Sequence, residues 1–198
     1  MAIKILLCLI VGYLIGSLNF AIIYSKLKGD DIRNHGSGNA GATNVLRTYG
    51  KGPAALVFIL DILKGVIAIL LMRIVFEGML YDCSAALGAV LGHNFPVYYK
   101  FKGGKGVSTS LAVLITLHFP TALAAMITFV VVAVLTKYVS LSSILAAVAA
   151  IVTAFAVFKI DVFSIFCAII GLLCIYRHRS NIKRLLNGTE NKLGQKKG

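Results

Sequence analysis

The sequence predicts an all-α integral membrane protein that forms a single domain over residues 1–198. Of the 198 residues, 59% are hydrophobic and only 14% are charged, and the mean hydropathy is +0.89. The apolar residues fall in long uncharged runs, whereas the strands of a membrane barrel alternate apolar and polar positions. Because a bilayer cannot satisfy backbone polar groups, such runs indicate membrane-spanning helices.

Seven apolar runs are candidates for these helices. They occur at about residues 3–24, 54–72, 83–98, 107–118, 121–135, 139–158 and 162–176. The stretch 107–135 forms either one long span or two short spans joined at His118, Phe119 and Pro120. Several runs are shorter than the roughly 20 residues that cross a hydrocarbon core, so length alone does not decide the number of spans.

The distribution of basic residues favours seven spans, because cytoplasmic loops carry an excess of Lys and Arg. With seven spans, 16 of the 20 basic residues lie on one side and 3 on the other, and Lys64 lies within a span. With one span over 107–135 the division is 9 against 10. We therefore expect the N-terminus outside, the C-terminus in the cytoplasm and three polar segments on the cytoplasmic face. Residues 190–198 are expected to form a flexible basic tail.

The composition also argues against other classes of protein. The net charge of +13 would suit nucleic acid, but a nucleic-acid domain carries its basic residues on a soluble face, and here they lie between apolar runs. We expect no nucleic-acid partner. With only 7 acidic residues, a carboxylate-bound metal has little support, and no metal is expected. The HxxxxD acyltransferase pattern, the GxSxG elbow and the HExxH zinc motif are absent from the sequence.

The first polar segment, residues 37–47, reads SGNAGATNVLR. Its glycines let backbone N–H groups converge, its short polar side chains add donors and its arginine adds a fixed positive charge. This pattern predicts a phosphate-sized anion site, with an ordinary turn and helix cap as the alternative. The candidate residues are Ser37, Gly38, Asn39, Gly41, Thr43, Asn44 and Arg47.

The second polar segment, residues 92–108, reads GHNFPVYYKFKGGKGVS. It is not a Walker A loop, because Tyr99 stands where that motif needs its first glycine and Gly106 follows the lysine. Gly103, Gly104 and Gly106 still surround Lys105 just before an apolar helix, which suits an oxyanion. The alternative is a flexible basic loop that contacts lipid headgroups.

The third polar segment, residues 177–194, follows the last apolar run. If the helix continues, Arg177, Asn181 and Arg184 share one face, with His178 beside them at the membrane boundary. The alternative for His178 is an interfacial histidine without a task.

Two charged residues, Asp61 and Lys64, lie three positions apart within the second apolar run. Charges inside a membrane are costly and usually face a polar cavity. They form either a self-neutralising structural pair or a charged wall beneath the polar loops.

Together, these segments resemble those of the bacterial membrane acyl-phosphate:glycerol-3-phosphate acyltransferases, the PlsY family, over nearly the whole chain. The resemblance rests on three groups of residues in the same order. They are Ser37-Gly-Asn with Gly41-Ala-Thr-Asn44 and Arg47; Gly92-His-Asn-Phe-Pro96 with Phe101 and Gly103-Gly-Lys-Gly106; and Arg177-His178 with Asn181, Arg184 and Glu190.

The resemblance implies transfer of a fatty acyl group from acyl phosphate to the 1-hydroxyl of sn-glycerol 3-phosphate, which gives lysophosphatidic acid and inorganic phosphate. This is the first acylation of phospholipid biosynthesis. It also implies a multi-pass protein of the bacterial cytoplasmic membrane, in contact with membrane lipids, that uses no cofactor and takes neither CoA nor acyl carrier protein as its direct donor.

The resemblance further suggests roles for individual residues. Ser37, Arg47 and Lys105, with the glycine N–H groups, are expected to bind phosphate. His178 and Asn181 are expected at the reacting centre or on glycerol 3-phosphate, with Arg184, and Arg177 beside it, near a phosphate. The general base is left open between His178, His93 and a phosphate oxygen of the substrate. Asp61, Lys64 and Glu190 are further candidates.

Two other classes of protein are alternatives to this enzyme. A transporter for an organic phosphate should show repeated halves and broken helices at the midplane, whereas the polar residues here cluster towards one face. A lipid-binding scaffold explains the basic tail but not the Gly-Gly-Lys-Gly loop.

Overall fold

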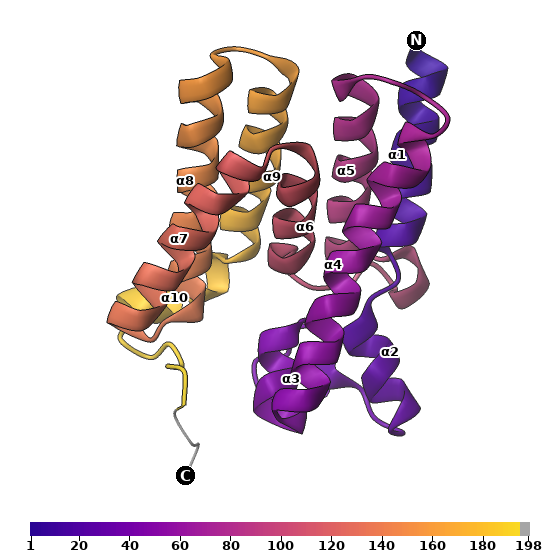
Figure 1. Cartoon of the computed structure of the whole chain (residues 1–198). Helices are drawn as coiled ribbons and strands as arrows, with labels where there is room; N and C mark the ends of the chain where they lie inside the picture. Colours follow the sequence, from indigo (N-terminus) through magenta and orange to yellow (C-terminus); the bar gives the residue numbers. More distant parts are fainter. Residues whose placement is uncertain (195–198) are drawn as a thin grey trace. The chain divides into compact units, whose positions relative to one another are not determined.

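A computed structural model describes residues 1–194, and all regular elements in that range are helical (Figure 1). The predicted all-α class is therefore confirmed for the described residues. The chain divides into two compact units, Met1–Leu117 and His118–Gly198, and the single domain expected from the sequence stays a prediction. Of the predicted tail, residues 195–198 lie outside the described residues.

The first unit is organised around the long helix α4, which packs against α1, α3, α5 and α6 (Figure 1). Its elements are α1 (Ala2–Gly16), α2 (Phe20–Leu27), the 3₁₀ turn η1 (Ile32–Asn34), α3 (Ala42–Tyr49), α4 (Lys51–Arg73), α5 (Met79–Asn94), the 3₁₀ turn η2 (Val97–Tyr99) and α6 (Val107–Leu117). The polar loops of this unit connect η1 to α3 and η2 to α6.

Glycine contacts bring α1 and α5 close together. Gly12 and Gly16 on α1 lie against the backbone of α5, and Gly88 and Gly92 on α5 lie against the backbone of α1. A Cβ at any of the four would overlap main-chain atoms of the partner helix. This four-residue spacing of small residues is typical of helix pairs in membranes, where close packing replaces the hydrophobic effect as the source of stability.

A small apolar core supports the loop before α3. Ile32 and Ala40, which flank this loop, are fully buried together with Ile22 of α2, Val45 of α3 and Val57 of α4. The loop is therefore attached to α2, α3 and α4 through its own apolar residues, and this packing fixes the position of its polar groups.

The second unit consists of α7 (Phe119–Thr136), α8 (Val139–Phe158), α9 (Val162–Arg177) and α10 (Arg179–Leu186). Helix α8 packs against both α7 and α9, and α10 contacts α8 and α9. The chain bends by 55° between α9 and α10. The condition under which Arg177, Asn181 and Arg184 would share one helix face is therefore not met, because Arg177 ends α9 whereas Asn181 and Arg184 lie on α10.

The breaks between helices agree in part with the predicted runs. The break at His118 is confirmed, since α6 ends at Leu117 and α7 begins at Phe119 with proline in its first turn. The first run was predicted as one helix but is interrupted before α2, where the Asn19 side chain caps the new helix by accepting a hydrogen bond from Ile22 N (3.1 Å).

Four helical segments within the described residues are long and apolar enough to cross a membrane: Ala2–Leu27, α4, α7 and α8. The bent pair of α9 and α10 makes a fifth if it counts as one span. Helices α5 and α6 have 16 and 11 residues, so the count of seven spans stays a prediction.

We predict that Gly88→Ala destabilises the protein, because its new Cβ would overlap the Leu9 carbonyl oxygen and force α1 and α5 apart. Overpacking of this kind costs about 1–3 kcal/mol, measurable as a lower unfolding temperature in detergent. The matched control is Gly52→Ala on α4, where no atom lies within 4 Å of the added Cβ. Equal unfolding temperatures for the two variants would contradict the close packing.

Candidate active site

The loop before α3 is closed by the side chain of Asn44. Its Oδ1 accepts a hydrogen bond from Ser37 N (2.9 Å), and its Nδ2 donates to the carbonyl oxygens of Ile32 (3.1 Å) and His35 (2.9 Å). The sequence predicted that Asn44 binds phosphate, whereas the buried amide is committed to the loop itself. Gly38, at φ +70°, provides the left-handed backbone that the tight turn requires.

The remaining candidates of this segment lie around the start of α3. Gly41 is the N-cap of α3, and no side chain caps the helix. The first turn therefore presents the positive end of the helix dipole. Thr43 and Arg47 lie four residues apart, on one face of α3. Ser37 and Asn39 lie in the loop that leads into this turn.

The glycine loop before α6 packs on the end of α5. Gly104 N donates to the carbonyl oxygen of His93 (3.1 Å), and a Cβ on Gly104 would overlap the His93 ring. A Cβ on Gly103 would overlap the His93 carbonyl oxygen. Gly106 has φ +80° and lies against Asn94 Oδ1. The glycines are therefore required by contact with α5, a reason that the anion-binding pattern alone did not reveal.

The two glycine-containing loops meet within the first unit. A Cβ on Gly104 would come within 2.7 Å of the carbonyl oxygen of Ala40, and Asn19 Nδ2 donates to the same oxygen (3.2 Å). The loop that ends at Gly41 and the loop that carries Lys105 are thus neighbours. The structure brings together the first and second predicted segments, 65 residues apart between Ala40 and Lys105 along the chain.

Three polar side chains near the start of α6 lack a hydrogen-bond partner within residues 1–194. They are Asn94 at the end of α5, and Thr109 and Ser110 in the first turns of α6. Asn94 and Thr109 are fully buried. Because buried polar groups in folded proteins are nearly always hydrogen-bonded, these groups need a polar partner from outside the protein.

A buried charged cluster lies beneath the glycine loop. Lys64 Nζ on α4 is 2.7 Å from Asp61 Oδ1, 2.9 Å from His93 Nδ1 and 2.9 Å from the carbonyl oxygen of Leu18. An ammonium has three hydrogens, and here three acceptors surround it. The sequence left open a self-neutralising pair or a charged wall beneath the polar loops. The structure has features of both, since Asp61 and Lys64 neutralise each other and Lys64 also contacts His93, which lies against the glycine loop.

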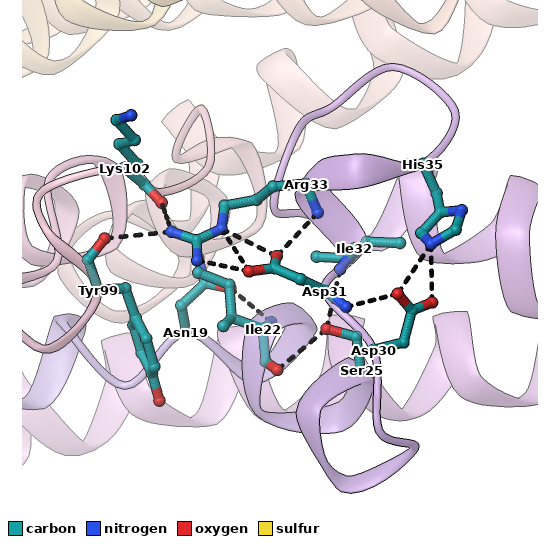
Figure 2. A network of polar contacts seen from close by, with 10 residues as sticks. All are labelled: Asn19, Ile22, Ser25, Asp30, Asp31, Ile32, Arg33, His35, Tyr99 and Lys102. Carbon is teal, nitrogen blue, oxygen red and sulfur yellow. Dashed lines mark hydrogen bonds and ion pairs between the residues drawn. The ribbon is translucent and has the colours of Figure 1, made fainter.

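An arginine outside the predicted set joins the two loop regions (Figure 2). Arg33 forms a two-point ion pair with Asp31, through Nε to Oδ1 (2.9 Å) and Nη2 to Oδ2 (2.6 Å). Its Nη1 donates to the carbonyl oxygens of Tyr99 (3.2 Å) and Lys102 (3.4 Å). The Asp-Ile-Arg sequence just before the first segment was the only local signal for this contact.

A second acidic residue in this region supports the end of α3. Asp30 accepts hydrogen bonds from Tyr49 Oη (2.7 Å) and lies 2.8 Å from His35 Nε2. The bond from Tyr49, and then the contact with His35, hold the pKa of Asp30 below its usual range, and the same bond raises the pKa of Tyr49 to about 12. These groups brace the loop and do not point to proton transfer.

In the second unit, three side chains donate hydrogen bonds to Glu190. It accepts hydrogen bonds from Asn181 Nδ2 (2.7 Å), Ser140 Oγ (2.9 Å) and Arg184 Nε (2.7 Å). Burial alone would raise the pKa of Glu190, but the bonds from Asn181, Ser140 and Arg184 outweigh it and lower the pKa. Glu190 was predicted to begin a flexible tail, whereas here it is buried and bonded.

His178 lies at the bend between α9 and α10. Its Nδ1 is 2.8 Å from the carbonyl oxygen of Cys174. A carbonyl oxygen only accepts hydrogen bonds, so Nδ1 carries the proton and the neutral ring has its lone pair on Nε2. Arg177 precedes the bend at the end of α9. No three His, Cys, Asp or Glu side chains in residues 1–194 come together to hold a metal ion.

The fold and these loops define a class of protein, namely helical integral membrane proteins with glycine loops suited to anions. The sequence profile of the glycerol-3-phosphate acyltransferase family matches residues 6–188, and the chain belongs to this family. The resemblance found in the sequence is thus confirmed. Membership places the chain among the integral membrane acyltransferases of phospholipid biosynthesis.

The chain is similar to curated glycerol-3-phosphate acyltransferases over nearly its full length. It is 50% identical over 188 residues to the enzyme of Thermoanaerobacter sp. (strain X514), and the aligned region covers 94% of each chain. It is 46% identical over 203 residues to that of Shouchella clausii (strain KSM-K16), which covers 99% of each chain.

Two solved structures share the fold. Both are crystal structures of PlsY (YgiH), an integral membrane glycerol 3-phosphate acyltransferase. The glycerol 3-phosphate form has a TM-score of 0.90 and 42% identity, and covers 96% of each chain. The lysophosphatidic acid form has a TM-score of 0.87 and 41% identity, and covers 96% of this chain and 95% of the other.

We predict that Lys64→Met strongly destabilises the protein, because it leaves the carboxylate of Asp61 buried without its cation. Breaking a buried pair in this way costs about 3–5 kcal/mol, seen as a lower unfolding temperature in detergent. The double variant Asp61→Asn, Lys64→Met should recover part of the loss.

The control for this prediction is Lys51→Met at the start of α4, where the lysine is exposed. That change should cost no more than about 0.5 kcal/mol. A double variant no more stable than Lys64→Met would contradict the unpaired Asp61 carboxylate as the cause of the lost stability.

Proposed function

We propose that this protein transfers a fatty acyl group from acyl phosphate to the 1-hydroxyl of sn-glycerol 3-phosphate. The products are lysophosphatidic acid and inorganic phosphate. The observation that carries the proposal is the meeting of the loop before α3 with the Gly103–Gly106 loop. It lies next to the buried amide of Asn94, which has no hydrogen-bond partner among residues 1–194. Relatives crystallised with glycerol 3-phosphate and lysophosphatidic acid support the acceptor and the product.

The resemblance to the family implies the donor, and the chemistry of the site is suited to it. An acyl phosphate is a mixed anhydride that is already activated, so the protein needs no covalent intermediate. It needs to align the hydroxyl and to stabilise charge on the departing phosphate. Backbone N–H groups, the N-terminus of α6 and the Lys105 ammonium are suited to that charge. In keeping with the family resemblance, CoA and acyl carrier protein are not proposed as direct donors, and no cofactor is proposed.

The reaction is a single acyl transfer. The 1-hydroxyl oxygen of glycerol 3-phosphate attacks the acyl carbonyl carbon, an ester bond forms, and the bond between that carbon and the phosphate oxygen breaks. We assign Ser37, Arg47 and Lys105, with the Gly103–Gly106 loop, to phosphate binding. The N–H groups of Gly38, Gly41 and Gly104 donate to the carbonyl oxygens of His35, Asn39 and His93, so these three glycines shape the loops. Asn39 and Thr43 supply further donors at the start of α3.

The hydroxyl proton needs an acceptor, and the two candidate histidines differ in this respect. His93 presents Nδ1 to the ammonium of Lys64, so that nitrogen is occupied as an acceptor. In its neutral form, His178 donates from Nδ1 to the Cys174 carbonyl oxygen and has its lone pair on Nε2. We propose His178 as the histidine that meets the hydroxyl. A phosphate oxygen of the substrate is the other acceptor that this chemistry allows.

The remaining candidates belong to the second unit. We propose that Asn181 and Arg184, held by Glu190, bind glycerol 3-phosphate, with Arg177 near its phosphate. The hydrogen bonds to Glu190 support this assignment, because they orient the Asn181 amide and the Arg184 guanidinium before any ligand arrives.

We further propose seven spans in the bacterial cytoplasmic membrane, with the N-terminus outside and the C-terminus and the glycine loops in the cytoplasm. The four or five helical segments of spanning length support this topology, and the short helices α5 and α6 would complete it. The excess of basic residues on one side supports the orientation. Acyl phosphate then reaches the site from the surrounding membrane lipids.

A direct test uses the purified protein in detergent with hexadecanoyl phosphate and sn-glycerol 3-phosphate. We expect lysophosphatidic acid and inorganic phosphate to form in equal amounts, because each transfer releases one phosphate. Hexadecanoyl-CoA as the only donor should support no transfer. Acylation with the CoA ester but not with the acyl phosphate would overturn the donor. Uptake of labelled glycerol 3-phosphate into proteoliposomes without a donor would favour a transporter.

Lys105→Ala should lower turnover by about 10²-fold or more if its ammonium stabilises charge that develops on phosphate. The measurement is phosphate release at saturating substrates, with the unfolding temperature as a check on folding. Lys102→Ala is the matched control, since this exposed neighbour carries the same charge in the same loop. Near-normal turnover in folded Lys105→Ala would remove Lys105 from the site.

A further inference from the structure

The glycine loop is preceded by an unusual stretch of backbone. Lys100 and Phe101 have φ values of +56° and +58°, a region that non-glycine residues seldom adopt, and they do so consecutively. Both side chains are exposed, so apolar packing does not enforce this path. Such a conformation persists only where surrounding contacts over-determine it.

Backbone hydrogen bonds supply part of that constraint. Phe101 N donates to the carbonyl oxygen of Pro96 (3.0 Å), and Lys102 N donates to that of Tyr99 (3.2 Å). These bonds close the turn upon itself. They do not attach it to the rest of the first unit, so the path of the chain towards Lys105 depends on contacts from other elements.

Arg33 makes such a contact on both sides of the strained pair (Figure 2). Its Nη1 donates to the carbonyl oxygens of Tyr99 (3.2 Å) and Lys102 (3.4 Å), which lie immediately before and after Lys100 and Phe101. One guanidinium nitrogen therefore holds the two ends of the left-handed turn together. The residue after Lys102 is Gly103, the first glycine of the loop.

The other side of the guanidinium is anchored to the first unit. Arg33 Nε and Nη2 bind the two carboxylate oxygens of Asp31, and the side chains of this pair are only 25% and 26% exposed. Between them, Ile32 is fully buried, and its N–H donates to Ser25 Oγ of α2 (3.0 Å). The turn is thus tied through Arg33 to the core beneath the loop before α3.

We propose that Arg33 is a positioning residue for the acyl transfer, which holds the turn at residues 99–102 so that the Gly103–Gly106 loop delivers Lys105 to the phosphate. This inference rests on the proposed placement of Lys105 in the site. Arg33 itself acts through the loop and does not contact the reacting atoms.

The geometry requires arginine and not merely a positive charge. The planar guanidinium uses one edge for the carboxylate and still has Nη1 for two carbonyl oxygens. A lysine ammonium has three donors around a single nitrogen and cannot match this arrangement. Arg33→Lys therefore keeps the charge and removes the connection between Asp31 and the turn.

The test combines kinetics with amide hydrogen exchange on the full-length protein in detergent. In Arg33→Lys and Arg33→Ala we expect kcat/KM to fall by about tenfold or more, because a loop displaced by about 1 Å loses that much. Exchange of the amides of residues 99–106 should quicken by about tenfold or more, since the turn opens locally. Arg73→Ala, which breaks an ion pair of equal length at the far end of α4, should change neither measurement.

A double-mutant cycle shows whether Arg33 acts through Lys105. In the Lys105→Ala background, Arg33→Lys should cost less than about threefold, because the group that it positions is already gone. If the kcat/KM losses of the two single variants multiply in full in the double variant, the proposal is overturned and Arg33 acts as a direct ligand. Wild-type kinetics and exchange in Arg33→Lys would also overturn it. Lys100→Gly should restore part of the Arg33→Lys loss, since glycine adopts the turn without strain.

The same experiments separate this inference from the proposed function. If Lys105→Ala is fully active, the placement of Lys105 fails whatever Arg33 does. If Lys105→Ala is inactive and Arg33→Lys leaves exchange at residues 99–106 unchanged, only the positioning role fails. Where Arg33→Ala does not fold, Arg33→Lys and Asp31→Asn carry the test. The first removes the connection to the turn and the second removes the charge of the carboxylate, each with a smaller change in volume.

Discussion

The candidate active site depends on the contact between Gly104 and the end of α5. The N–H of Gly104 donates to the His93 carbonyl oxygen, and the absence of a side chain lets the loop lie against the His93 ring. The end of α5 is held in turn by α1, because Gly92 lies against the backbone of that helix and Tyr13 Oη donates to the Phe95 carbonyl oxygen (2.7 Å). Helix packing within the first unit therefore sets the position of the glycine loop.

The buried charges of α4 belong to the same arrangement. An ammonium inside a membrane protein is tolerated where its charge is balanced and its hydrogens are bonded. Lys64 meets both conditions through Asp61, His93 and the Leu18 carbonyl oxygen. One cation thus joins α4, the end of α5 and the chain between α1 and α2. The ion pair and hydrogen bonds offset the cost of burying this cation, and the contact with His93 holds the histidine ring under the glycine loop.

Sequence patterns identified the glycine loops, the helix break at His118 and most of the polar candidates. They did not reveal that the Asn44 amide is used inside its own loop, that the chain bends at His178, or that Glu190 is buried. Arg33 was missed for the same reason. Its partner Tyr99 lies 66 residues away, and a hydrogen bond to a distant carbonyl oxygen leaves no mark on local composition or periodicity.

The sequence by itself determined the helical class, the membrane as the surrounding medium and the two loops that suit anions. These follow from local physics, namely the length of apolar runs, the cost of unpaired backbone groups in lipid and the conformational freedom of glycine. Only the tertiary structure decided which polar groups hold the loops and which lack a protein partner. The amides of Asn44 and Asn94 are alike in the sequence. The Asn44 amide makes three hydrogen bonds to the backbone of the chain before α3, whereas the Asn94 amide has no hydrogen-bond partner within the described residues. Which folded elements come near each amide makes that difference, and no local sequence pattern encodes this.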